Sequence, residues 1–177
     1  DFRAESEILF YENCNILGVK MTKVGDEVKI QGIKTKKKGE IFLYTPIGYD
    51  KSTDFDIRFY ENGNLSYIRC LTHNTNIQNI ECERDSSVSF YRNGKLLQAR
   101  LAKDTIIQGI RCMSSELINL YDTGELESAV VSIDTEIQGY RIKSQSIIYL
   151  YKNGKIKEAT LFDDKLIKLS ETGQKID

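Results

Sequence analysis

The sequence predicts an all-β protein, built from tandem antiparallel β-hairpins that form one elongated meandering sheet. Three observations predict it: a turn motif that recurs along the chain, a second motif that recurs between the turns, and strand-favouring residues around both. The 177 residues include ten Tyr, seven Phe, one Pro and no Trp. We expect a single β-repeat domain over residues 1–177, with about five repeats at a period of about 30 residues.

The first motif is a turn that reads aromatic-x-Asn-Gly between apolar residues. Its glycines, Gly63, Gly94, Gly124 and Gly154, lie 31, 30 and 30 residues apart, and a fifth copy has Cys14 in the glycine position. Asn-Gly between alternating apolar residues is typical of a two-residue type I′ hairpin turn. The predicted repeats are 8–35, 57–82, 87–112, 117–142 and 147–169, with an irregular insertion at 36–56.

A two-residue turn at Asn-Gly would set the register of each hairpin. The tyrosine three residues before each glycine would then lie opposite the apolar residue two positions after that glycine, as in Tyr91–Leu96. Further from the turn, we expect Ile57, Val88, Ile118 and Ile148 opposite Ile68, Ala99, Ala129 and Ala159.

Alternation along the strands then separates two faces of the sheet. The predicted core face carries Phe59, Phe90, Leu120 and Leu150, together with Cys70, Leu101, Val131 and Leu161. The other face is predicted to be polar, with Arg58, Ser89, Gln98, Asn119, Ser128 and Glu158, except for the Tyr–Leu pairs near the turns.

The second motif reads Ile-Gln-Gly and lies between successive turns, with Asn79 in the glycine position of one copy. Because Asn tolerates a positive φ better than other non-glycine residues, we interpret this position as a β-bulge with positive φ. The glutamines at 31, 78, 108 and 138 are interpreted either as a side-chain ladder or as caps for the free backbone groups of a bulge.

A β-solenoid and a closed barrel remain alternatives to the open meander. Cys82 and Cys112 are equivalent residues of two repeats, and they would stack about 4.8 Å apart in a solenoid with one coil per repeat. In a meander they would lie roughly three strand spacings apart, too far for a disulfide. Whether Cys14, Cys70, Cys82 and Cys112 are free thiols is left open.

Composition and motifs argue against several function classes. The net charge is −1, from 25 basic and 26 acidic residues, so no global field would attract nucleic acid. No apolar run approaches the about 20 residues that a transmembrane helix needs. No nucleophile motif, phosphate-binding loop or carboxylate pair is apparent, and the only His, His73, is expected in an exposed loop. We therefore expect no enzyme, no catalytic residue and no cofactor.

Metal binding is not expected either. The cysteines show no Cys-x-x-Cys spacing of the kind that zinc sites use. Asp104, Asp134 and Asp164 each lie ten residues after a turn glycine, and one Asp in each repeat fits a local turn better than a calcium site.

The tyrosines are the candidate binding residues. Tyr11, Tyr60, Tyr91, Tyr121 and Tyr151 recur with the repeat and would line one edge of the sheet. Such a stripe suits a linear binding surface, since aromatic rings offer large, rigid contact areas with a polar group. The alternative is that each ring packs on its own Leu and the stripe holds the repeats together.

The compartment is suggested only by the first residue. The chain begins at Asp1 without Met, which favours a secreted, periplasmic or envelope protein whose leader has been removed. A chain trimmed for any other reason would begin in the same way.

The recurring Tyr-x-Asn-Gly-Lys-Leu followed by Ile-Gln-Gly resembles the variant MORN-type repeats of bacterial proteins, the YwqK-like group that includes proteins described as antitoxins. The resemblance covers nearly the whole chain except 36–56, although the period here is longer, and Cys14, Thr123 and Asn79 depart from the motifs. It implies an elongated antiparallel sheet with a binding or scaffolding role and no catalytic residues.

The leading hypothesis is therefore a non-enzymatic bacterial repeat protein that presents a sheet surface to a protein or a cell-envelope component. A barrel-like carrier of an apolar ligand and an antitoxin-like partner protein are the alternatives. The oligomeric state is left open.

Overall fold

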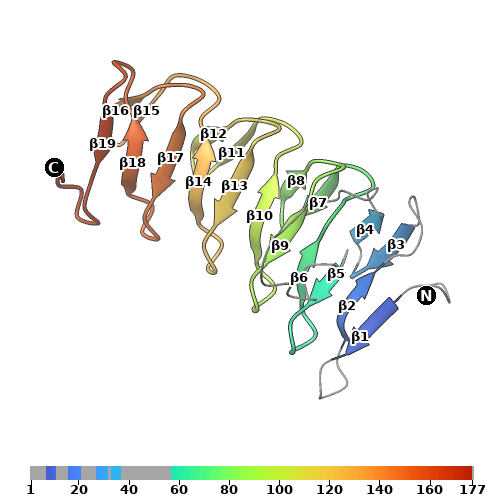
Figure 1. The fold of residues 1–177 in the computed structure, drawn as a ribbon. Helices are drawn as coiled ribbons and strands as arrows, with labels where there is room; N and C mark the ends of the chain where they lie inside the picture. The colour runs from blue at the N-terminus through green and yellow to red at the C-terminus, as the bar shows by residue number, and fades with distance from the viewer. Residues whose placement is uncertain (1–6, 11–15, 21–26, 32, 37–56, 177) are drawn as a thin grey trace, which may run out of the picture.

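The fold is an elongated, twisted array of antiparallel strands with β1 and β19 at opposite ends (Figure 1). The computed structural model describes residues 7–10, 16–20, 27–31, 33–36 and 57–176, and these form nineteen strands and no helix. The predicted all-β hairpin repeat is therefore confirmed. Tyr11, Cys14 and the insertion at 36–56 lie outside the described residues.

Eleven strands form one large sheet, in which the two strands of each Asn-Gly hairpin follow those of the previous hairpin. In sheet order they are β1 (Glu7–Phe10), β2 (Ile16–Lys20), β5 (Ile57–Phe59), β6 (Leu65–Ile68), β9 (Val88–Phe90), β10 (Leu96–Arg100), β13 (Leu117–Leu120), β14 (Leu126–Val130), β17 (Ile147–Leu150), β18 (Ile156–Thr160) and β19 (Leu166–Lys168).

This large sheet is open, with β1 at one end of its strand order and β19 at the other. A closed barrel would join the two ends, so that alternative is wrong. The solenoid alternative is also wrong, because stacked coils of one repeat each would place equivalent strands side by side in parallel, whereas every pair of neighbours here is antiparallel.

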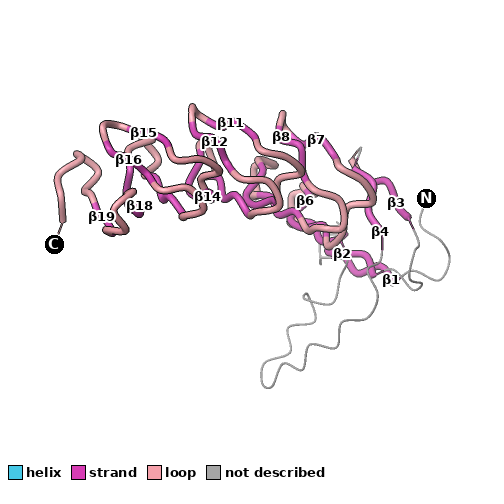
Figure 2. The backbone as a smooth tube through the Cα atoms, turned by 90° about the horizontal axis from the view of Figure 1, so that it is seen from above, coloured by secondary structure: helices cyan, strands magenta, loops and turns pink. Residues whose placement is uncertain are grey.

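Four two-stranded hairpins form a second layer on one side of the large sheet (Figure 2). They are β3 (Glu27–Ile30) with β4 (Ile33–Lys36), β7 (Thr75–Ile77) with β8 (Ile80–Cys82), β11 (Thr105–Ile107) with β12 (Ile110–Cys112), and β15 (Thr135–Ile137) with β16 (Tyr140–Ile142). We call them the hairpin layer, and the opposite side of the large sheet the outer face. One repeat thus supplies two strands to the sheet and two to the hairpin layer.

The core lies between the two layers and runs along the array from Ile30 to Leu169. The predicted core residues Phe59, Phe90, Leu120 and Leu150 are buried, as are Cys70, Leu101 and Val131, whereas Leu161 is only partly buried. The predicted pairs Ile57–Ile68 and Val88–Ala99 are present. Asn119–Ser128 and Tyr149–Glu158 continue the same register in the next two hairpins.

The Asn-Gly turns are not the two-residue type I′ turns that the motif predicted. In the Tyr91 turn, the Gly94 amide donates to the Tyr91 carbonyl at 2.9 Å, and the Tyr91 amide donates to the Lys95 carbonyl at 2.8 Å. Only Gly94 has a positive φ, of 82°. This pattern is a type I turn followed by a glycine bulge, which places three residues in the loop instead of two.

The extra loop residue changes which side chains face the core near each turn. Leu96 lies opposite Phe90, not opposite Tyr91, and a second irregularity follows between Leu96 and Gln98. The predicted Tyr–Leu pairs are therefore wrong. Their aliphatic members, Leu65, Leu96, Leu126 and Ile156, are all buried in the core instead of lying on the polar face.

The Ile-Gln-Gly motif forms the type I′ turn that was expected at Asn-Gly. Ile107 pairs directly with Ile110, and the two residues between them, Gln108 and Gly109, have φ values of 51° and 82°. Positive φ at both central residues is the signature of a type I′ hairpin. The predicted positive φ at the glycine position is confirmed, but the predicted bulge is wrong, because the motif closes a two-residue hairpin.

The last hairpin departs from the repeat. Residues 165–176 contain β19 and an additional turn, in which Gly173 has a φ of 90° and its amide donates to the Ser170 carbonyl at 2.8 Å. No Ile-Gln-Gly hairpin separates this turn from β18. Ser170 stands where the other turns carry a tyrosine.

Cys70, Cys82 and Cys112 are buried thiols that form no disulfide. Cys82 and Cys112 each form an isolated antiparallel bridge, with Leu101 and Val131, the residues that directly follow β10 and β14. Burial raises the pKa of Cys82 to about 12 and that of Cys112 to about 11, so both remain protonated thiols at neutral pH.

Candidate functional site

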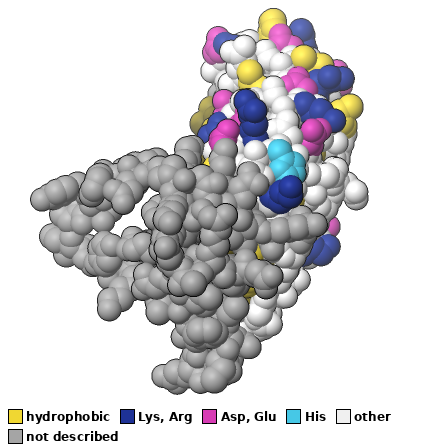
Figure 3. Space-filling model, turned by 90° about the vertical axis from the view of Figure 1, so that its right-hand side faces the viewer, with side chains coloured by type: hydrophobic (Ala, Val, Ile, Leu, Met, Phe, Trp, Pro, Cys, Tyr) yellow, Lys and Arg dark blue, Asp and Glu magenta, His cyan; other side chains and the backbone are white. Residues whose placement is uncertain are grey.

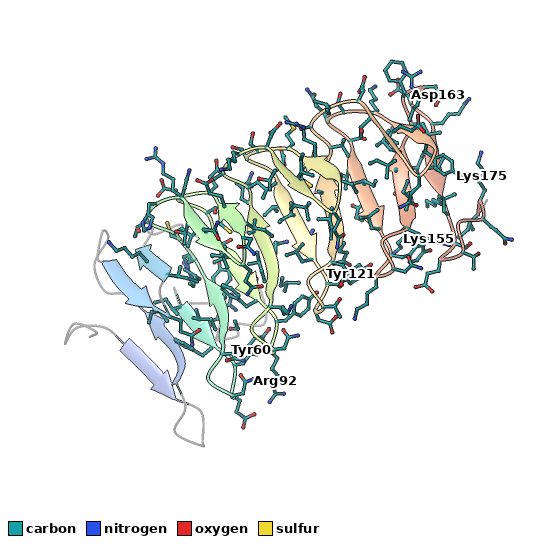
Figure 4. All side chains as sticks on the ribbon, turned by 180° about the vertical axis from the view of Figure 1, so that it is seen from behind. Tyr60, Arg92, Tyr121, Lys155, Asp163 and Lys175 are labelled. Carbon is teal, nitrogen blue, oxygen red and sulfur yellow. The ribbon has the colours of Figure 1, made fainter. Side chains whose placement is uncertain are left out.

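The four described tyrosines of the predicted stripe lie beside the Asn-Gly turns, along what we call the tip edge of the sheet (Figure 4). Each is half-buried and donates its hydroxyl to a main-chain carbonyl of the next hairpin. The acceptors for Tyr60, Tyr91, Tyr121 and Tyr151 are Phe90, Leu120, Leu150 and Leu169, at 2.7, 2.8, 2.7 and 2.9 Å. The stripe therefore links successive repeats, and a role in binding a partner stays a prediction.

The environment of two of these hydroxyls favours the protonated form, which can donate a hydrogen bond. Burial is the largest cause that raises the pKa of Tyr91 and Tyr121, followed by the nearby carboxylate of Glu127. Both tyrosines thus stay protonated at neutral pH.

The other residues of the turn motif also connect neighbouring repeats. The Asn93 side chain donates to the Asp122 carbonyl at 2.8 Å and accepts the Lys95 amide at 3.0 Å. The Lys95 ammonium donates to the Thr123 carbonyl at 3.4 Å. The Tyr-x-Asn-Gly-Lys motif is thus explained by contacts within the array.

Ion pairs join some adjacent turns at the tip edge. Arg92 lies 3.8 Å from Glu61, and the Lys152 ammonium lies 2.6 Å from an oxygen of Asp122. The hydrogen bond from Lys152 is the largest cause that lowers the pKa of Asp122. All four side chains are largely exposed, so these pairs contribute little to stability.

The glutamines of the Ile-Gln-Gly motif cap the glycine bulges of the Asn-Gly turns. The Gln138 side-chain nitrogen donates to the Gly154 carbonyl at 2.8 Å, and its oxygen accepts the Ile156 amide at 3.1 Å. Gln78 makes the same two bonds with Gly94 and Leu96. Of the two predicted roles, capping of free backbone groups at a bulge is the one that the structure supports.

Replacing Gln138 with Asn is expected to lower the free energy of unfolding by about 1–3 kcal/mol, because the shorter side chain leaves the Ile156 amide and the Gly154 carbonyl unpaired. Asn tolerates the positive φ at this position, so backbone strain does not explain a loss. Urea denaturation measures this change in the free energy of unfolding. Gln145→Asn is the control, since Gln145 also has a positive φ, of 59°, but its side chain makes no hydrogen bond to the described residues. Equal effects of the two changes would contradict the capping role.

The predicted turn aspartates secure the loop that leads back to the sheet. Asp104 accepts the Ser114 amide at 2.9 Å, and Asp134 accepts the Ser144 amide at 2.8 Å. In the second repeat, Asn74 accepts the Arg84 amide in the same way. These backbone bonds are the largest cause that lowers the pKa of Asp104 and Asp134 below 3.8.

The stability of a variant that carries both Asp104→Asn and Asp134→Asn is expected to fall less at acidic pH than the stability of the wild-type protein. A carboxyl whose folded pKa is lowered contributes stability above its unfolded pKa and loses it as the pH falls through the folded pKa. The wild-type protein should therefore lose this contribution as the pH falls below 3.8, the ordinary value of these carboxyls. The Asn variant keeps the acceptor oxygen, as Asn74 shows, so melting temperatures should match at pH 7 and diverge near pH 3. A parallel decline of both proteins would contradict this role.

The outer face of the sheet is polar in its central row. Cross-strand neighbours there include Arg58, Tyr67, Ser89, Gln98, Asn119, Ser128, Tyr149, Glu158 and Lys168. The Gln98 side chain donates to Asn119, and that of Asn119 donates to Ser128, each at 2.8 Å. The Arg58 guanidinium lies 4.3 Å from the centre of the Tyr67 ring. The predicted polar character of this face is confirmed for this row.

A second row of the outer face is mostly apolar in its C-terminal half, with Thr160 as a polar member on β18, and this row was not predicted from the sequence. Leu117, Ile147 and Leu166 are 40%, 48% and 57% exposed. Val130 on β14 pairs with Ile147 on β17. Leu166 on β19 pairs with Thr160 on β18, the strand between β17 and β19. We call Leu117, Val130, Ile147 and Leu166 the apolar row. Alternation along β13, β14, β17 and β19 is the signal that could have predicted it.

The residues considered for catalysis and metal binding remain apart. His73 is exposed, as expected, and its ring contacts the hydroxyl of Thr72 at 2.7 Å. Among the described residues, no three His, Cys, Asp or Glu side chains gather as a metal site would require. In Figure 3, Lys and Arg alternate with Asp and Glu on the visible part of the described surface.

The described part of the chain contains no helix of the length and apolarity needed to cross a membrane.

Comparisons with protein-family models, with curated proteins and with solved structures find no match to this chain. The resemblance to variant MORN-type repeats therefore stays a prediction from the motifs.

Proposed function

We propose that this chain is a non-enzymatic repeat protein that presents the outer face of its sheet to a partner protein, at the cell envelope or elsewhere. The apolar row is the observation that carries the proposal. It consists of exposed aliphatic side chains from β13, β17 and β19 on one face, with the partly exposed Tyr149 in the neighbouring row. Exposed apolar side chains grouped on one face within a polar surround are typical of protein interaction sites.

The proposal agrees with how the repeat motifs are used. Tyrosines, asparagines and glutamines of the motifs bond to neighbouring hairpins, so they build a rigid support. Side chains that vary between repeats then distinguish one part of the outer face from another. Arg100 lies directly opposite Leu117, so the apolar row meets a basic side chain at its N-terminal end.

Site-specific photo-crosslinking in the native cell tests this function. A photoreactive residue at position 147 should give a defined protein adduct, which Leu117→Arg should abolish. Ile106 is the matched control, because it is 63% exposed but belongs to β11 in the hairpin layer. The same adduct from positions 147 and 106, or an adduct that survives Leu117→Arg, would contradict the proposal. A catalytic activity of the purified protein that His73→Ala abolishes would contradict the proposal that the protein is not an enzyme.

The carrier alternative needed a barrel lumen, which an open sheet does not form, and it is not proposed. The antitoxin-like role rests on the motif resemblance and stays a prediction.

A further inference from the structure

The outer face between β13 and β19 has β17 as its central strand. In sheet order, β14 and β18 lie on either side of β17, and β13 and β19 lie beyond them. A two-fold axis along β17 would bring a second copy of the chain face to face with the first. Such an axis exchanges β14 with β18 and β13 with β19, and it keeps positions along the strands. Each row of side chains would therefore meet the same row of the second copy.

The apolar row is nearly symmetric about β17. Ile147 lies on this strand and would contact the Ile147 of the second copy. Leu117 on β13 would meet Leu166 on β19, and Val130 on β14 would meet Thr160 on β18, which has the size of a valine. Apart from Thr160, the axis thus brings aliphatic side chains together along the whole row.

Opposite charges occupy equivalent positions on the two strands beside β17. Glu127 on β14 and Lys157 on β18 directly follow the buried residues Leu126 and Ile156. Alternation therefore directs both charged side chains to the outer face. The Lys157 ammonium lies 5.9 Å from the centre of the Tyr151 ring, and neither Glu127 nor Lys157 forms an ion pair with another described residue. Exchange of β14 with β18 would place each carboxylate opposite the ammonium of the other copy.

These charges distinguish β17 from its neighbours as the axis. An axis along β14 would place Glu127 against the Glu127 of the second copy, and an axis along β18 would do the same with Lys157. Like charges that face each other weaken an interface, whereas opposite charges set its register. Of the three strands, β17 is the one about which both the charges and the apolar row are complementary.

The geometry of the sheet permits this arrangement. The hairpin layer lies on the opposite side of the sheet (Figure 2). Sheets that pack face to face lie about 10 Å apart, with their strands within about 30° of each other. An axis close to the direction of β17 meets this condition. Tyr149, which is 39% exposed on the same strand as Ile147, would then contact the Tyr149 of the second copy.

We propose that the outer face binds a second copy of this chain, in a symmetric dimer whose two-fold axis runs along β17. This dimer rests on the proposed function, because it uses the apolar row and names the partner. The row spans four strand spacings, or about 19 Å, so the interface is small for a specific complex, and association should be reversible.

Sedimentation velocity of the purified chain over a range of concentrations should show an equilibrium between monomer and dimer. Ile147→Lys places two ammonium groups together on the axis, so the dissociation constant should rise about tenfold or more. Ile106→Lys is the matched control, because Ile106 is 63% exposed but belongs to the hairpin layer, and it should leave the dimer unchanged. A monomer at every concentration, or equal effects of the two variants, would overturn the proposal.

Exchange of the two charges tests the position of the axis. Glu127→Lys and Lys157→Glu each create like charges across the interface, so each alone should weaken the dimer, and the two together should restore it. Urea denaturation of every variant separates a loss of folding from a loss of association. A double variant that folds but associates no better than the single variants would overturn an axis along β17.

Chemical crosslinking provides an independent measure of the same axis. A bismaleimide that reaches about 10 Å, one sheet spacing, should join two Ile147→Cys chains. The same reagent should not join two Leu117→Cys chains, because these residues lie about 20 Å apart across the axis. Both variants carry Cys14→Ser, and the three described cysteines are buried. Efficient joining of the Leu117→Cys chains would contradict the axis.

The dimer and the proposed function can fail separately. In the photo-crosslinking experiment, an adduct of two copies of this chain at position 147 supports both. An adduct with a different protein, together with a purified chain that stays monomeric, overturns the dimer and leaves the proposed function intact. The absence of any adduct at position 147, with a monomeric chain, overturns both.

Discussion

Replacing Leu126 with Ala is expected to lower the free energy of unfolding by about 2–5 kcal/mol, one of the two largest effects predicted for a described residue. Leu126 is fully buried and lies opposite Leu120 in the core between the two layers. Its removal leaves a cavity that rigid strands and the neighbouring hairpin fill poorly. Chemical denaturation measures the loss.

The same experiment tests the register of the hairpin. If a two-residue type I′ turn formed at Thr123 and Gly124, Leu126 would lie on the outer face beside Tyr121, and its truncation would cost much less. Glu127→Ala is the control, since Glu127 is the next residue and is only partly buried. A loss below about 1 kcal/mol for Leu126→Ala would contradict the glycine bulge.

The second large loss of stability is expected in a triple variant in which Phe replaces Tyr91, Tyr121 and Tyr151. Each change removes one hydroxyl that donates to the next hairpin and leaves the ring in place. The expected cost is about 0.5–1.5 kcal/mol for each hydroxyl, or about 1.5–4.5 kcal/mol in total, because the three sites lie in separate repeats and should add. Thermal and urea unfolding of the triple variant measure it.

Tyr149→Phe is the matched control for the triple variant. Tyr149 is an exposed outer-face tyrosine whose hydroxyl makes no hydrogen bond to the described residues, so its loss should leave stability unchanged. A stable triple variant would contradict the packing role of the stripe and favour the binding role. Loss of stability with intact binding by the outer face would support separate roles for the two surfaces.

The amino-acid sequence by itself determined the repeat and most of the core. The recurrence of Asn-Gly and Ile-Gln-Gly, together with alternating apolar residues, predicts short antiparallel strands at a common period. Alternation also assigns Phe59, Phe90, Leu120 and Leu150 to the buried face, because neighbouring side chains of a strand point to opposite sides. These are local consequences of backbone geometry, so they need no knowledge of distant contacts.

The tertiary structure alone decided which motif forms which turn. Asn-Gly and Gln-Gly both permit positive φ at the glycine, but a glutamine at positive φ is strained, and nothing local favours it. Gln138 adopts a φ of 54° because its side chain there caps the Gly154 turn, sixteen residues away. That contact exists only once the hairpin layer packs on the sheet, and it offsets the strain.

The same reason explains the tyrosines and the buried leucines near the turns. A motif shows that Tyr121 recurs, but its acceptor, the Leu150 carbonyl, belongs to the next repeat. Leu126 reaches the core because a glycine bulge adds one residue to the loop, and that turn is capped from the hairpin layer by Gln108, which accepts the Leu126 amide at 3.1 Å. Periodicity thus determined the array, and contacts between repeats determined its turns and the faces of the residues beside them.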